Sequence, residues 1–277
     1  MAVLNRLLPL FFSACFFLPQ VWSQQRPLQT DDANLIGVGE VRTELGVEFF
    51  QDQQYSLSGL RGDLSRLGVA SIHVGVGEYA EFQISGVVQD FLSISERAPD
   101  PPVPSTVTGN STNDYGNLIL ASKIRMSAEK GFRPALAFKF AVELPNAKPE
   151  SGLGKSETNF YASLLAAKRL KRAELLANVG FGILGSPVEA RSQADPLTYG
   201  FAVIFPVCKN VNLVGEINGR QGPYRLGNEN QSQVRAGLQI RTSALRWDIA
   251  GIAGLKEFDP DSGVAFGVTY QLKVFHK

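Results

Sequence analysis

The sequence predicts an all-β fold, a transmembrane antiparallel up-and-down β-barrel of about twelve strands. Apolar and polar residues alternate with a period of two along most of the chain, which is typical of strands with two unlike faces. The connections between these segments are long and short in turn. No segment after residue 23 has the roughly 18 consecutive apolar residues of a membrane-spanning helix.

Residues 40–49 show the alternation clearly. Val41 and Leu45 fall on one face of the predicted strand, whereas Glu44 and Glu48 fall on the other, because successive side chains of a strand point to opposite faces. The same pattern predicts strands at residues 70–76, 80–85, 118–126, 136–144, 159–164, 174–183, 199–205, 211–218, 234–241, 245–253 and 264–274.

Residues 161–178 fit this pattern least well. They contain good helix formers and would by themselves be interpreted as an amphipathic helix. The rhythm of the whole chain favours two strands joined near residues 170–172, and we predict the strands.

The connections give a second test of the barrel. Bacterial outer-membrane barrels have short periplasmic turns and longer external loops. The long connections are predicted at residues 51–63, 90–116, 145–157, 186–196, 221–231 and 258–262, and the short ones at residues 77–78, 129–131, 171–172, 209–210 and 243–244.

A closed barrel also explains the charged faces of the strands. In hydrocarbon every backbone N–H and C=O must be paired within the protein, which only helices and closed sheets achieve. The apolar faces would then contact lipid and the charged faces would line the interior, where a wet lumen avoids the cost of burying unpaired charge.

The N-terminal residues predict export. Residues 1–23 combine a basic start, an apolar stretch and small residues at the end, as a secretory signal peptide does. We predict a periplasmic N-terminal segment at residues 24–36 and the barrel domain at residues 37–277, located in the bacterial outer membrane. Removing the signal peptide removes one base, Arg6, and leaves a formally neutral chain, which argues against nucleic acid as a partner.

Several segments resemble a family of outer-membrane transporters named after the MetA pathway of phenol degradation. The most specific is Arg-Pro-Leu-Gln-Thr-Asp-Asp-Ala at residues 26–33, followed by Gly-Val-Gly at residues 37–39. Residues 67–82, 116–125 and 133–145 are similar to it as well. The resemblance implies a barrel channel for aromatic or other hydrophobic nutrients, and it supplies no catalytic residues.

Inward-facing charges are the candidate site residues. They mix acids and bases, which favours ion pairs across strands over a strongly ion-selective pore, and these charges could equally serve only to satisfy one another. The residues predicted to line the lumen are Glu40, Arg42, Glu44, Glu48, His73, Glu81, Lys123, Arg125, Lys139, Glu143, Glu216, Arg235, Arg241, Arg246, Asp248 and Lys273.

Other chemistry is expected to be absent. His73 is predicted to face the lumen, whereas a lipase-like barrel enzyme needs a histidine that faces outward near a serine. No residues have metal-ligand spacing, so we expect neither a metal nor another cofactor. Asp31 and Asp32 are predicted to lie in a solvated tail, with cation binding or a plug at the periplasmic mouth as alternatives.

We therefore expect passive uptake of small solutes through a narrow polar lumen. The expected partners are outer-membrane lipid, a small-molecule solute and the barrel-assembly machinery. Three alternatives remain: a barrel enzyme acting on lipids, a structural barrel with a blocked lumen, and a soluble periplasmic all-β protein.

Overall fold

The computed structural model describes residues 26–189 and 191–274. The predicted signal peptide, residues 1–23, lies outside them. Within the described ranges twelve long strands form the barrel and two short strands extend it. The long strands are β1 (Glu40–Tyr55), β2 (Leu60–Gly75), β3 (Ala80–Arg97), β5 (Leu118–Ser127), β6 (Ala135–Leu144), β7 (Asn159–Leu170), β8 (Ala173–Gly185), β10 (Leu197–Cys208), β11 (Val211–Gln221), β12 (Gln231–Arg241), β13 (Leu245–Gly254) and β14 (Ser262–Lys273).

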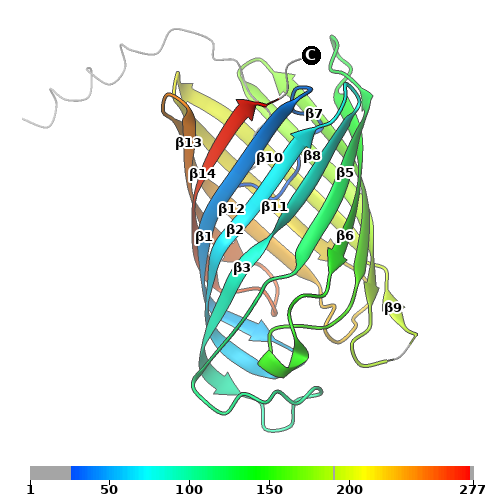
Figure 1. Cartoon of the computed structure of the whole chain (residues 1–277), viewed down its shortest axis with the longest axis vertical. Helices are drawn as coiled ribbons and strands as arrows, with labels where there is room; N and C mark the ends of the chain where they lie inside the picture. The colour runs from blue at the N-terminus through cyan, green and yellow to red at the C-terminus, as the bar shows by residue number, and fades with distance from the viewer. Residues whose placement is uncertain (1–25, 190, 275–277) are drawn as a thin grey trace, which may run out of the picture.

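Each long strand pairs with its neighbours in an antiparallel arrangement, and β1 pairs with β14 to close the sheet (Figure 1). The short strands β4 (Ser111–Asp114) and β9 (Gln193–Ala194) pair with β3 and β8. The prediction of a closed antiparallel barrel of twelve strands is confirmed. The only helix in the described ranges, the 3-10 turn η2 (Pro149–Ser151), lacks the length and apolar character of a helix that crosses a membrane.

Residues 161–178 form parts of two strands, as predicted. The chain reverses at residues 171–172, where Lys171 has a φ of 53°. The register of β7 and β8 runs without interruption from Leu170↔Ala173 to Asn159↔Leu184. Sheet pairing therefore decides the structure of this segment, against the helix propensity of its residues.

The two ends of the barrel differ. Short turns lie at the end that carries the C-terminus of β14, and we call this the short-turn end (Figure 1). At the opposite, long-loop end, β1 and β2 continue to Tyr55 and Leu60, so the long connection predicted at residues 51–63 is wrong. Polar residues dominate this extension, and the alternation that reveals a strand is therefore lost there.

The alternation of faces is as predicted over most of the barrel. Outward positions carry exposed Leu, Ile, Val and aromatic side chains, and Leu213, Leu238 and Ile249 lie side by side on β11, β12 and β13. Among inward positions, Arg42, Glu44 and other charged side chains are buried.

One bulge changes this alternation. Gly68 of β2 has a φ of 67° and is left over in the pairing, because Gly46 faces Val69 and Val47 faces Leu67. An extra residue of this kind favours glycine and reverses the facing of the residues before it. Arg66 therefore turns inward, although the alternation around His73 would place it outside.

Replacing Leu238 by arginine tests the outward band. Leu238 is 37% exposed on the outer face of β12, and an arginine in the middle of a lipid-facing band destabilises a barrel by about 2–4 kcal/mol. We expect that loss in chemical unfolding of the protein in lipid vesicles. Tyr115→Arg, in an exposed connection, is the control, and an equal effect of both changes would contradict the placement of the band.

Candidate functional site

The chain from residue 26 to residue 38, here called the N-terminal segment, contacts the inner wall of the barrel. Leu28, Thr30, Asp31 and Asp32 are all buried. The prediction of a solvated tail for the two aspartates is wrong. The described part of the stretch predicted to lie in the periplasm, residues 24–36, is enclosed by the barrel instead.

Carboxylates of the wall bind the backbone of this segment. The Glu216 carboxylate accepts hydrogen bonds from the backbone N–H of Gln29, at 2.8 and 3.0 Å, and from that of Thr30, at 2.8 Å. On a different part of the wall, Glu81 accepts the N–H of Ile36 at 2.9 Å. Hydrogen bonds to a charged acceptor are stronger than those between neutral groups, so two wall residues hold the segment at both ends.

Cationic and amide side chains of the wall bind its carbonyl groups. The Lys123 ammonium donates to the carbonyls of Asp32 and Asn34, each at 3.1 Å. Gln239 donates to the carbonyl of Arg26 at 2.7 Å. The segment thus supplies acceptors for buried donors of the wall.

Arg26 occupies a recess formed by two glycines that face each other across β1 and β14. A Cβ atom on Gly46 would lie 2.3 Å from Nη2 of Arg26, and one on Gly267 would lie 2.4 Å from its Nε. The guanidinium donates to the carbonyl of Phe266 at 3.0 Å and lies 3.5 Å from the Asp248 carboxylate. Absence of side chains at both glycines makes this close approach possible.

Apolar packing holds the segment as well. Leu28 and Ala33 belong to a buried cluster with inward-facing residues of β6, β7, β8, β10 and β11. This part of the interior is apolar, whereas the sequence predicts a polar lumen. Small and apolar residues such as Ala137 and Ala202 face inward here because the segment covers them.

The structure places most of the predicted lumen residues inside. Glu40, Arg125, Lys139, Glu143 and Arg241 are half-buried, and Lys273 is exposed at the end of β14. The buried ones are Arg42, Glu44, Glu48, His73, Glu81, Lys123, Glu216, Arg235, Arg246 and Asp248. Whether any of them contacts a solute stays a prediction.

Many of these charges form ion pairs, and two mixed groups lie along β1. Towards the short-turn end, Glu44 lies 3.5 Å from Arg42 and 3.7 Å from Arg246. Towards the long-loop end, Glu48 lies 2.9 Å from Arg235 and 3.8 Å from Arg66. Both groups mix the two signs, as the sequence predicts, which limits the field that either sign exerts on a passing ion.

His73 joins a chain of hydrogen bonds. Its Nε2 lies 3.1 Å from Oγ of Ser71, and its Nδ1 lies 2.9 Å from Glu81 and 3.1 Å from Nη2 of Arg42. The spacing is that of a serine hydrolase triad. However, Nδ1 faces a guanidinium as well as a carboxylate, so Glu81 alone does not fix the tautomer that would accept a proton from Ser71. Ser71 also lies 3.2 Å from the Glu44 carboxylate.

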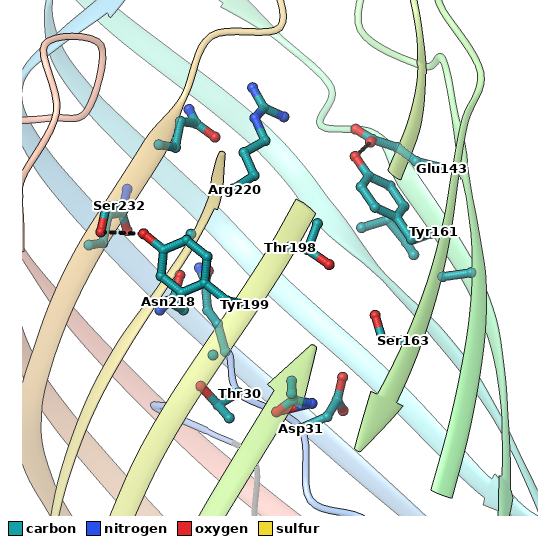
Figure 2. A pocket seen from close by; sticks show the side chains of 18 of the residues that line it. Thr30, Asp31, Glu143, Tyr161, Ser163, Thr198, Tyr199, Asn218, Arg220 and Ser232 are labelled. Atoms are coloured by element: carbon teal, nitrogen blue, oxygen red, sulfur yellow. Dashed lines mark hydrogen bonds between the residues drawn. The ribbon is translucent and has the colours of Figure 1, made fainter. Parts of the chain in front are cut away.

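A cavity of about 610 Å³ lies between the N-terminal segment and the long-loop end. Figure 2 shows Thr30 and Asp31 at one end of it and Arg220 and Glu143 towards the other. Tyr199 donates to Ser232 at 2.8 Å on one wall. The loops above are tied together, since Ser58 donates to the carbonyl of Gly152 at 2.7 Å.

Three basic residues of the cavity were not among the predicted lumen residues. Arg220 continues the inward positions Glu216 and Asn218, and extending the alternation by one step would have found it. Arg66 is hidden by the bulge at Gly68. Lys155 lies in a connection, where no periodic signal exists.

Comparison with known proteins supports the fold. No protein-family model matches the chain, and no curated protein sequence matches it. A crystal structure of an outer-membrane channel from Pseudomonas putida F1 matches with a TM-score of 0.61 and 11% identity, over 87% of this chain and 98% of the channel. The translocator domain of the autotransporter NalP from Neisseria meningitidis matches with a TM-score of 0.50 and 12% identity, over 85% and 89%. The chain therefore has the fold of outer-membrane β-barrel proteins.

Gly267→Ala tests the recess for Arg26. The added methyl group would lie 2.4 Å from Nε of Arg26 and should displace the start of the N-terminal segment. We expect faster labelling of a cysteine introduced at Gln29, in a Cys208→Ser background, by a water-soluble thiol reagent. In the control Gly251→Ala the new methyl group meets nothing within 4 Å. Equal labelling of both variants would show that the recess does not hold the segment.

A hydrolysis assay tests the Ser71 and His73 arrangement. Because both side chains point into the barrel and not towards lipid, we expect no hydrolysis of phospholipid esters by the purified protein. Activity that disappears in both Ser71→Ala and His73→Ala, with barrel folding unchanged on a heat-modifiability gel, would contradict this expectation.

Proposed function

We propose that the protein is an outer-membrane channel for passive uptake of small solutes and is not an enzyme. The apolar outer band contacts lipid, the short-turn end faces the periplasm, and the barrel-assembly machinery inserts the exported chain. The observation that carries the proposal is the cavity of about 610 Å³ at the long-loop end of the barrel. The buried N-terminal segment separates this cavity from the short-turn end.

The N-terminal segment acts as the gate in this proposal. Its polar contacts run to Glu216, Glu81 and Lys123, which lie on β11, β3 and β5, so it bridges distant parts of the wall. A solute can pass only when the segment moves away and water replaces it as the hydrogen-bond partner of these wall residues. Water can hydrate charged wall residues at a low cost in free energy after the segment has moved, whereas it hydrates an apolar wall poorly.

Membership of the MetA-pathway family of transporters, with aromatic or hydrophobic solutes, is the finer form of this proposal. Its support is the motif at residues 26–33, whose residues make the contacts that hold the segment. The structural likeness to an outer-membrane channel fits it.

A structural barrel with a blocked lumen is the second candidate. The packing of Leu28 and Ala33 in a dry cluster favours it, because apolar contacts oppose movement of the segment.

Single-channel recording in planar bilayers separates the two. Glu216→Gln removes the charge that accepts three hydrogen bonds from the segment. Hydrogen bonds to charged groups contribute about 1.5–3 kcal/mol, so roughly tenfold more open time is expected. Glu129→Gln, in a turn outside the lumen, is the control. A barrel silent in wild type and in Glu216→Gln would support the structural role instead.

A further inference from the structure

Two cations of the cavity have no carboxylate within ion-pair distance among the residues that the structure describes. Lys139, Arg235 and Arg66 also line it, and each is in an ion pair. Within the described residues, Lys155 and Arg220 form no such pair. Lys155 contacts the Asn228 side-chain oxygen at 3.4 Å, and Arg220 donates through Nε to the carbonyl of Glu229 at 2.9 Å.

The nearby carboxylates are already bound to neutral donors. Glu143 accepts hydrogen bonds from Asn117 at 2.7 Å, from Asn159 at 3.0 Å and from Tyr161 at 2.9 Å. Glu229 accepts one from the Ser56 hydroxyl and one from the backbone N–H of Gly227 at 2.6 Å. Neither carboxylate lies within ion-pair distance of Lys155 or Arg220, so the ammonium and guanidinium groups keep donors that an anion can meet.

The environment of Lys155 disfavours its charged form. Burial, together with the positive charge of Arg220, lowers the pKa of the Lys155 ammonium to about 8, against the opposing effect of Glu229 and Glu143. An anion bound there would remove part of this electrostatic cost.

An apolar surface lines the same cavity. Phe50 and Leu64 face each other across β1 and β2, point inward, and belong to a buried apolar cluster. Leu153, two residues before Lys155, packs against this cluster. The connection that carries the ammonium group is thereby fixed beside the apolar surface.

We propose that the cavity binds small amphipathic carboxylates, with Lys155 and Arg220 binding the carboxylate and the Phe50–Leu64 surface contacting the apolar body. The inference rests on the proposed uptake function and names its substrate class. A cavity of about 610 Å³ holds one such molecule with water around it. A guanidinium offers paired donors that match a carboxylate, and an ammonium adds a second, mobile donor.

Isothermal titration of the detergent-solubilised full chain with benzoate tests the site without requiring conduction. Saturable binding is expected for benzoate, at least tenfold weaker binding for benzamide, which has the same shape without the charge, and equally weak binding for acetate, which lacks the ring. Equal affinity for benzoate and benzamide would overturn the ionic half of the proposal. Equal affinity for benzoate and acetate would overturn the apolar half.

Substitutions locate the binding. Lys155→Gln and Arg220→Gln should each weaken benzoate binding about tenfold, because each removes a charge-assisted hydrogen bond. The control Lys148→Gln changes an exposed lysine of the same connection that does not line the cavity and should bind as wild type does. Wild-type affinity in both cavity variants, or an equal loss in the control, would show that benzoate binds elsewhere.

The pH dependence gives an independent readout. Benzoate binds the protonated ammonium, so wild-type affinity should fall as the pH rises above about 8, where Lys155 loses its charge. Lys155→Arg keeps the charge and should remove this decline. Arg220, Glu229 and Glu143 act on the charge of the Lys155 ammonium. An unchanged decline in Lys155→Arg would show that Lys155 does not cause it and would overturn the role of Lys155.

The two proposals can fail separately. A barrel that conducts ions but does not bind benzoate would overturn the carboxylate site and leave the channel intact. A barrel that binds benzoate through Lys155 and Arg220 but never conducts would overturn the uptake function and leave a binding site.

Discussion

Pairing of β1 with β14 is the interaction on which the rest of this structure depends. It joins the first and last strands over a register that runs from Glu40↔Lys273 to Gln51↔Ser262. A sheet that closes on itself leaves no edge, so its backbone can be surrounded by hydrocarbon without unpaired N–H or C=O groups. Closure also divides the residues into an outer and an inner set, and the outer set here is apolar.

The inner set creates a second requirement. Acidic and basic residues face one another across a narrow interior, and a charge buried without a partner is costly. The N-terminal segment meets part of this requirement with main-chain groups, because Glu216 binds its N–H groups and Lys123 binds its carbonyls. Leu28 covers the apolar part of the inner wall at the same time. The N-terminal segment therefore pairs the polar groups of the inner wall and, at the same time, obstructs the lumen.

Much of the barrel could be predicted from the sequence, because a period of two is a strong signal wherever one face is apolar. The inward position of Glu44 follows from that signal alone. The position of Arg66 does not, because the bulge at Gly68 reverses the alternation. Burial of Asp31 could not be predicted either, since the local sequence is polar and its partner, Lys139, is more than a hundred residues away. Lys155 depends on the packing of a connection, which has no periodicity.

Amide hydrogen exchange of the protein in lipid vesicles tests the central claim most directly, namely that the N-terminal segment is held in the lumen by wall carboxylates. The backbone N–H groups of Gln29, Thr30 and Ile36 are bonded to Glu216 and Glu81. The account predicts that these amides exchange far more slowly than an unstructured peptide, as amides of the strands do. Exchange of all three at the rate of an unstructured peptide would contradict it.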